Sequence, residues 1–149
     1  MIFVTVGSTR FDALIKAVDE LAAKRTIDMP VVCQIGSGDY VPRHCEHFRY
    51  APSLDPWLEK AELLVCHGGT GSVFAAFRHQ KRFVAIANTE LADDHQTELL
   101  SKLGEGLPIF WGRSPSDLEP LIASALVAPP IVFDSRRLVD DLNQYLAKN

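Results

Sequence analysis

Two turns in the sequence combine glycines with hydroxyl side chains in a pattern that suits an anion. They are Gly7-Ser8-Thr9 and His67-Gly68-Gly69-Thr70-Gly71-Ser72. Glycines let a backbone approach a ligand without obstruction by a Cβ atom. A helix that follows such a turn presents free N–H groups and a positive dipole end, which favour phosphate. The second turn adds the hydroxyls of Thr70 and Ser72 and the imidazole of His67. It therefore predicts a phosphate site, most naturally for a diphosphate.

A single glycine turn is most simply a tight connection between a strand and a helix. Two such turns favour a ligand site instead, because they can converge on one crevice. The first turn lacks the Gly-x-Gly-x-x-Gly pattern of dinucleotide-binding proteins, and no Gly-Lys-Ser/Thr of a P-loop occurs in the chain. NAD binding and ATP hydrolysis are therefore disfavoured.

A third polar segment covers residues 88–96. It contains Asp94, His95 and Gln96, whose side chains can hydrogen-bond the hydroxyls of a sugar. The alternative is structural: Asp93 or Asp94 would be the N-cap of a helix, with His95 and Gln96 exposed in its first turn. Spacing alone does not separate these two interpretations.

Short apolar runs alternate with helical patterns along the chain, which is typical of a parallel α/β sheet. We predict strands at Ile2–Val6, Val31–Ile35, His47–Tyr50, Glu62–Cys66, Arg82–Ala87 and Pro108–Trp111. Helices are predicted at Phe11–Ala22, Leu54–Ala61, Val73–His79, His95–Leu103, Leu118–Leu126 and from Ser135 to Leu146. The expected fold is an α/β, Rossmann-like, doubly wound and mostly parallel six-stranded sheet.

The common strand order of such a sheet, 3-2-1-4-5-6, makes the first and fourth strands neighbours. Ligands bind beyond their carboxyl ends, where both glycine turns are expected to lie. Ser114-Pro115-Ser116-Asp117 predicts the start of the fifth helix, because it combines an N-cap, a proline and a capping-box acid. The last helix carries an apolar stripe that packs either on the domain's own sheet or on a partner. The stripe consists of Leu138, Val139, Leu142, Tyr145 and Leu146.

Length and composition restrict the function further. With 149 residues the chain suits one domain over 1–149, and it is too short for a two-domain enzyme. Its net charge of −4 disfavours general nucleic-acid binding. Three cysteines at unrelated spacings and the lack of a signal-peptide pattern favour a reducing cytoplasm. His44-Cys45-Glu46-His47 lacks the four well-spaced ligands of a zinc site, so no metal site is expected.

Several motifs taken together resemble a known family. They are Phe3-Val4-Thr5-Val6-Gly7-Ser8-Thr9, Gln34-Ile35-Gly36-x-Gly38, Ala61-Glu62-Leu63-Leu64-Val65-Cys66-His67-Gly68-Gly69-Thr70-Gly71-Ser72 and Asp94-His95-Gln96. In this order they are similar to the carboxy-terminal, donor-binding domain of family 28 GT-B glycosyltransferases, and especially to its small stand-alone form. Such subunits act in the synthesis of dolichol-linked sugars in eukaryotes and of exopolysaccharides in bacteria.

The resemblance implies that the chain binds a UDP-sugar and is the catalytic subunit of a glycosyltransferase. It implies that Gly7, Ser8 and Thr9 line the donor crevice, and that His67, Gly69, Thr70, Gly71 and Ser72 hold the diphosphate. It also implies that Tyr50 and Ala51 lie near the uracil, and Asp94, His95 and Gln96 near the ribose or the donor sugar. His67 is the expected catalytic residue. The donors of the second turn can stabilise the leaving UDP, so no metal or other cofactor is expected.

One position departs from the family pattern. Related enzymes usually carry a glutamate three residues after the turn serine, where it binds the ribose hydroxyls, and this chain has Ala75 there. Glu90 or Gln96 are the candidates to replace it. The departure also keeps open a second interpretation, a nucleotide-binding or scaffold subunit without catalysis. A flavodoxin-like oxidoreductase is a third, weaker one.

The resemblance also implies partners. We expect a membrane-associated, acceptor-binding glycosyltransferase subunit and a lipid-linked sugar acceptor, and no nucleic acid. The chain would then be cytoplasmic and held at the inner face of the membrane through that partner. The sugar donated, the acceptor and the linkage are not encoded in any motif of the sequence.

Overall fold

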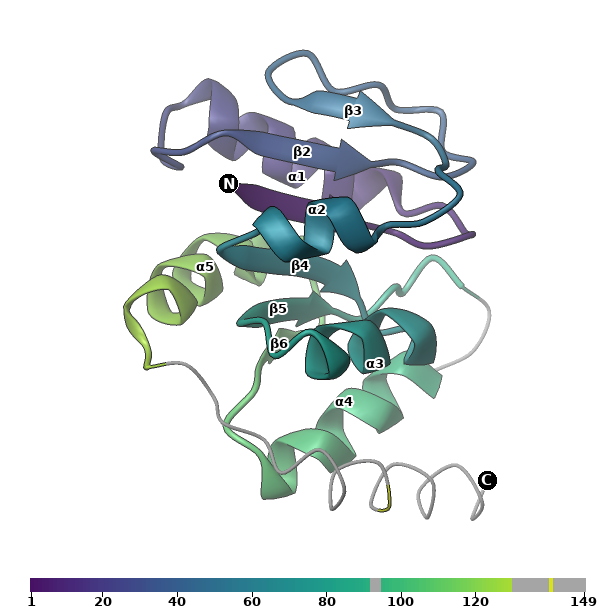
Figure 1. Cartoon of the computed structure of the whole chain (residues 1–149), viewed down its shortest axis with the longest axis vertical. Coiled ribbons are helices and arrows are strands. Elements are labelled where there is room, and N and C mark those ends of the chain that lie inside the picture. The colour runs from purple at the N-terminus through teal and green to yellow at the C-terminus, as the bar shows by residue number, and fades with distance from the viewer. Residues whose placement is uncertain (92–94, 130–139, 141–149) are drawn as a thin grey trace.

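The fold is one sheet of six parallel strands with helices on both faces (Figure 1). The computed structural model describes residues 1–91, 95–129 and 140. The strands are β1 (Ile2–Thr5), β2 (Val31–Gln34), β3 (Glu46–Phe48), β4 (Leu63–His67), β5 (Phe83–Ile86) and β6 (Phe110–Gly112). Their order in the sheet is β3-β2-β1-β4-β5-β6, and every neighbouring pair is parallel. The predicted fold class and strand order are confirmed.

The central strands are mostly apolar because helices cover both of their faces, and their polar residues Thr5, Gln34 and His67 lie at the carboxyl ends. Every residue of β1, β2, β4 and β5 is buried. The helices are α1 (Asp12–Ala23), α2 (Asp55–Lys60), α3 (Thr70–Arg78), α4 (His95–Gly106) and α5 (Leu118–Val127), with a short 3-10 helix at Pro115–Asp117 before α5. Side chains alternate across the sheet, so each strand contributes to two separate cores.

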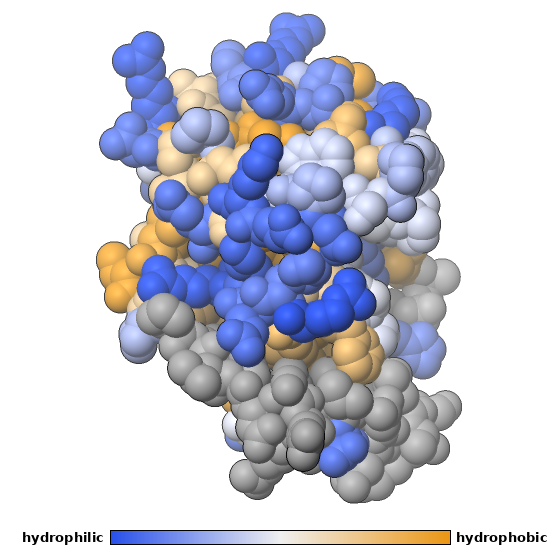
Figure 2. All heavy atoms as spheres, viewed as in Figure 1, coloured by the Kyte–Doolittle hydropathy of each residue, from blue (hydrophilic) through white to orange (hydrophobic). Residues whose placement is uncertain are grey.

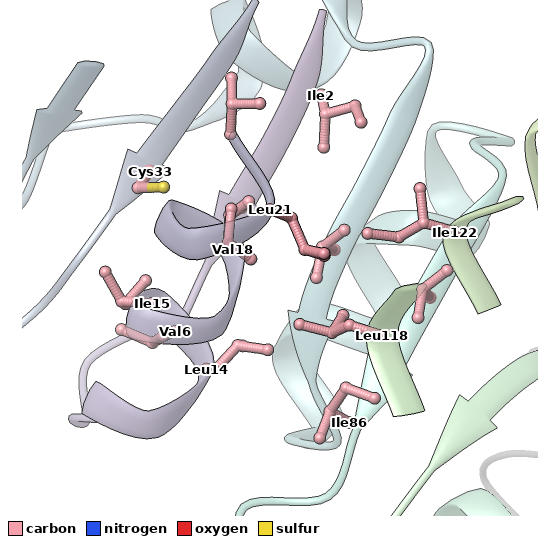
Figure 3. Close-up of a cluster of buried hydrophobic side chains, with 14 of the residues drawn as sticks. Ile2, Val6, Leu14, Ile15, Val18, Leu21, Cys33, Ile86, Leu118 and Ile122 are labelled. Carbon is pink, nitrogen blue, oxygen red and sulfur yellow. The ribbon is translucent and has the colours of Figure 1, made fainter. Parts of the chain in front are cut away.

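The two cores lie on opposite faces of the sheet. On one face α1 and α5 pack against alternate strand residues such as Ile2, Cys33 and Ile86 (Figure 3). On the other face α2, α3 and α4 pack against Phe3, Leu64 and their neighbours. This division of helices is the doubly wound arrangement that the sequence predicts.

The ends of several elements differ from the predicted ones. Helix α3 begins at Thr70, three residues before the apolar pattern suggests, because glycines and hydroxyl residues form its first turn. The predicted capping box is present: the Ser114 hydroxyl accepts the Ser116 N–H, and the Asp117 carboxylate accepts the Ser114 N–H. Apart from residue 140, the predicted last helix lies outside the described residues, and so does its whole apolar stripe. No helix in the described part of the chain is long and apolar enough to cross a membrane.

Asp19 is a buried carboxylate on α1 that holds the segment between β2 and β3. It accepts hydrogen bonds from the Tyr40 hydroxyl at 2.7 Å, the Arg43 N–H at 3.1 Å and the His44 N–H at 2.7 Å. Burial by itself raises the pKa of Asp19, but these donors together hold the pKa below its ordinary value. The ionised carboxylate therefore stabilises the fold.

Replacement Asp19→Asn should lower the free energy of unfolding by about 1–3 kcal/mol at neutral pH, because buried donors lose a charged acceptor. The folded-state pKa lies below the unfolded one of about 3.9, so the contribution is complete above the unfolded pKa. It is lost as the pH falls through the folded pKa, and the difference between wild type and variant should shrink there. Urea unfolding at a series of pH values measures this.

The matched control is Asp28→Asn, which changes an exposed carboxylate with no hydrogen bond to the described residues. It should leave the free energy of unfolding within about 0.5 kcal/mol of the wild type. Equal effects of the two substitutions, or an Asp19 effect that does not change with pH, would contradict this account of Asp19.

Candidate functional site

A cleft of about 650 Å³ lies beyond the carboxyl ends of β1 and β4. Both glycine turns line it, together with residues of α2, α3 and α4. The lining residues are Thr5, Gly7, Ser8, Thr9, Ser53, Leu54, Asp55, Leu58, Leu64, His67, Gly69, Thr70, Gly71, Ser72, Ala75, Arg78 and Gln96. The structure thus brings the two predicted turns to one cavity.

The first turn is held by a buried glutamine. Gly7 has a φ of +67°, a left-handed conformation that favours glycine. The side-chain amide of Gln34 accepts the Gly7 N–H at 3.0 Å and donates to the Gly7 carbonyl at 2.8 Å. It also donates to the Arg49 carbonyl at 2.7 Å, beyond the end of β3. Gln34 therefore fixes the turn to two neighbouring strands, a role that the sequence motif alone did not reveal.

The second turn ends in the N-terminus of α3, which points its backbone donors at the cleft. Gly69 is the N-cap residue and no side chain caps the helix. The first N–H groups of a helix have no partner within it, and here those of Thr70, Gly71 and Ser72 belong to residues that line the cleft. No acidic residue lies in the first turn. The site is therefore electrostatically suited to an anion.

His67, the first residue of the second turn, is a buried, neutral imidazole that lies against Gly7 of the first turn. Its Nδ1 accepts the Gly69 N–H at 3.0 Å, and its Nε2 lies 3.2 Å from the Ser72 hydroxyl oxygen. Because Nδ1 is an acceptor, Nε2 carries the proton in the neutral ring. Burial lowers the pKa of His67, although a hydrogen bond with Gln96 opposes that effect. His67 therefore contributes an N–H dipole to the cleft rather than a positive charge.

Gln96 lines the cleft, but its side-chain amide bonds mainly to the protein. Its Oε1 accepts the N–H of Gly68 at 2.9 Å and that of Asn88 at 2.9 Å. Its Nε2 lies 3.3 Å from Nδ1 of His67. Gln96 thus joins the ends of β4 and β5 and holds the imidazole. The resemblance implies a contact of Gln96 with the ribose or the donor sugar, and that contact stays a prediction.

Other predicted residues do not reach the cleft. Tyr50 is 57% exposed, and neither it nor Ala51 is among the lining residues. The strand β3 ends at Phe48, so both residues lie in the connection to α2. His95 is exposed at the start of α4 and does not line the cleft. Asp94 lies outside the described residues.

The wall formed by α2 and by the C-terminal part of α3 was not predicted from the sequence. Ser53, Leu54 and Asp55 line the cleft from α2 and the residues before it. Arg78 lines it from α3, although its position at a helix end favours a solvated side chain. Gly71, Ala75 and Arg78 are spaced four and three residues apart, so helical periodicity places them on one face. That periodicity is the signal that could have found them.

The described residues include no group of three or more His, Cys, Asp or Glu side chains placed to hold a metal ion. The polar groups of the cleft are its backbone donors, its hydroxyls, the imidazole of His67, the Gln96 amide and two charged side chains. Those two are Asp55 and Arg78.

The two glycines of the turns should respond differently to alanine. A Cβ atom on Gly7 would lie 2.9 Å from Nε2 of His67 at a left-handed φ, whereas one on Gly71 meets nothing within 4 Å. Gly7→Ala should therefore lower the free energy of unfolding by at least about 1–2 kcal/mol. Gly71→Ala should be neutral or stabilising by up to about 1 kcal/mol. Urea unfolding of the two variants checks this, and a Gly7→Ala variant as stable as Gly71→Ala would contradict the described turn.

The chain is similar to known proteins over most of its length. Residues 1–126 match the glycosyltransferase family 28 C-terminal domain. The UDP-N-acetylglucosamine transferase subunit ALG13 of Homo sapiens is 32% identical over 121 residues, which are 74% of this chain and 11% of that protein. ALG13 of Yarrowia lipolytica is 32% identical over 117 residues, 69% of this chain and 60% of that protein. The chain thus spans from about a tenth to three fifths of these relatives.

Solved structures share the fold. An NMR solution structure of ALG13 matches with a TM-score of 0.63 at 16% identity, and the match covers 91% of each chain. The crystal structure of Acinetobacter baumannii MurG matches with a TM-score of 0.62 at 18% identity, over 97% of this chain and 49% of that one. The family match and the fold agree. The chain belongs to glycosyltransferase family 28 and corresponds to the C-terminal domain of that family.

Proposed function

We propose that this chain is the donor-binding, catalytic subunit of a UDP-sugar glycosyltransferase. The observation that carries the proposal is the cleft in which the uncapped N-terminus of α3 faces the Gly7 turn. A diphosphate suits this position because backbone N–H groups, two hydroxyls and a helix dipole converge there. The family match and the name of the relatives, a UDP-N-acetylglucosamine transferase subunit, support a UDP-sugar as the ligand.

In the proposed reaction a hydroxyl oxygen of the acceptor forms a bond to the anomeric carbon of the donor sugar. The bond from that carbon to the β-phosphate oxygen breaks, and its electron pair leaves on UDP. The N–H groups at the start of α3, the hydroxyls of Thr70 and Ser72 and the Nε2–H of His67 stabilise the developing charge. Since these donors are fixed by the fold, no metal ion or other cofactor is required for this step.

The proposed acceptor is a lipid-linked sugar in glycan or exopolysaccharide synthesis, bound by a second, membrane-associated subunit. That subunit would also supply the base that takes the proton of the acceptor hydroxyl. The imidazole of His67 is unsuited to this role, because its acceptor nitrogen Nδ1 already accepts the Gly69 N–H. The chain would work in the cytoplasm, held at the membrane through this partner. The relatives are named as subunits of a transferase, which supports the two-component arrangement.

A second candidate function is a nucleotide-binding subunit without catalysis. Ala75 favours it, because this position on the cleft wall offers a methyl group rather than a polar contact to a nucleotide. The two candidates differ in one respect. If this chain is the catalytic subunit, blocking its cleft abolishes sugar transfer by the complex with the partner; if it is not, transfer continues.

Gly71→Asp is the substitution that blocks the cleft with the least damage to the fold. Its side chain enters open space beside the helix N-terminus and places a carboxylate where the diphosphate is expected. Titration calorimetry should show UDP binding to the wild type and at least about tenfold weaker binding to Gly71→Asp. His67→Ala should weaken binding as well. Transfer by the complex with the partner should fall in parallel.

The control is Gly106→Asp, which also adds a carboxylate to open space on a helix, but away from the cleft. It should bind UDP like the wild type. No UDP affinity in the wild type, even with the partner present, would refute the donor site. UDP binding that Gly71→Asp abolishes while transfer continues would favour the non-catalytic subunit.

A further inference from the structure

Two oppositely charged side chains line the cleft from two different helices and form no salt bridge with each other. Asp55 comes from α2 and Arg78 from α3, two helices on the same face of the sheet (Figure 1). The surface over these helices is largely hydrophilic (Figure 2). Oδ1 of Asp55 lies 3.1 Å from Nε2 of His79, whereas Oδ2 has no hydrogen-bond partner among the described residues. The cleft thus contains one carboxylate oxygen that is available to a ligand.

The length of α3 determines which part of a nucleotide this wall can meet. Gly71 lies at the anion end, and Ala75 follows one turn later, about 6 Å along the axis, on the same face. If a nucleotide binds with its diphosphate at the helix N-terminus and extends along α3, its ribose lies about one helical turn further on. Ala75 leaves the space open, because its side chain is a single methyl group. The ribose would therefore lie between Ala75 and α2.

Hydroxyl groups of a ribose are donors, and a carboxylate is a strong acceptor for them. Asp55 is the only carboxylate among the described residues that line the cleft. We propose, building on the proposed function, that Asp55 binds the ribose hydroxyls of the donor nucleotide and thereby selects a ribonucleotide. The alternatives found in the sequence are less suited, because Glu90 does not line the cleft and the Gln96 amide bonds to the protein.

The position of Asp55 is fixed by contacts between α2 and the end of α3. His79 holds the Asp55 carboxylate, and Lys81 donates to the carbonyls of Glu59 and Ala61 at 3.0 Å each. Both ends of α2 are therefore connected to the segment that follows α3. His79 is a positioning residue in this account, and His79→Gln should retain part of the preference for a ribonucleotide.

The experiment compares UDP with 2′-deoxy-UDP on the full chain by titration calorimetry. The wild type should bind UDP at least about tenfold more tightly than 2′-deoxy-UDP, because the deoxy ligand lacks a hydroxyl that hydrogen-bonds the charged carboxylate. Asp55→Asn should weaken UDP binding and reduce the ratio of the two affinities to about twofold or less. Glu59→Gln is the matched control, since it removes an exposed carboxylate of the same helix outside the cleft, and it should keep the wild-type ratio.

An unchanged ratio in Asp55→Asn would overturn the proposal, as would an equal loss of affinity for both ligands, which would indicate a purely structural role in α2. Asp55→Ala, checked for folding by thermal unfolding, gives the same test if the asparagine variant is unstable. These outcomes leave the donor site itself intact. Absence of UDP binding in the wild type would instead refute the proposed function and this inference with it.

Discussion

The parallel pairing of β1 with β4 is the constraint on which the site depends. Its register places Thr5 beside Cys66, so the residues that follow each strand leave the sheet at the same point. Gly7 and His67 then approach so closely that a Cβ atom on the glycine would contact the imidazole. Without this pairing, the Gly7 turn and the His67–Ser72 turn would lie apart and would form no common cleft.

Beyond the ends of the strands, side-chain amides join neighbouring segments in place of backbone hydrogen bonds. Gln34 bonds to the Gly7 turn and to Arg49, and Gln96 bonds to Gly68 and Asn88. Asn88 in turn donates to the carbonyl of Arg10 at 2.9 Å. Each of these amides joins segments that belong to different strands. The Gly7 turn and the residue before the N-cap of α3 are thereby held in place by the fold itself, as preorganised electrostatic stabilisation requires.

The arrangement of the sheet could be predicted because it follows from local patterns. Apolar runs of four or five residues between helical segments indicate buried parallel strands, and the order of such a sheet is restricted by general rules. The glycine turns could be assigned to one crevice for the same reason. The contribution of α2 could not be predicted, because the positions of Asp55 and Arg78 at the cleft depend on how two helices pack on the sheet. The hydrogen bonds of Gln96 to Gly68 and Asn88 could not be predicted either, because the sequence does not show which backbone groups a side-chain amide contacts.

The most direct test of the central claim is a titration of the nitrogen-15-labelled chain with UDP, followed through its backbone amide resonances. We expect the largest shifts at Thr70, Gly71 and Ser72 and in the Gly7 turn, because these residues line the proposed diphosphate site. Inorganic diphosphate should move the same resonances at higher concentration. Large shifts confined to another region, such as the segment around Asp19 and Tyr40, with the start of α3 unchanged, would contradict it.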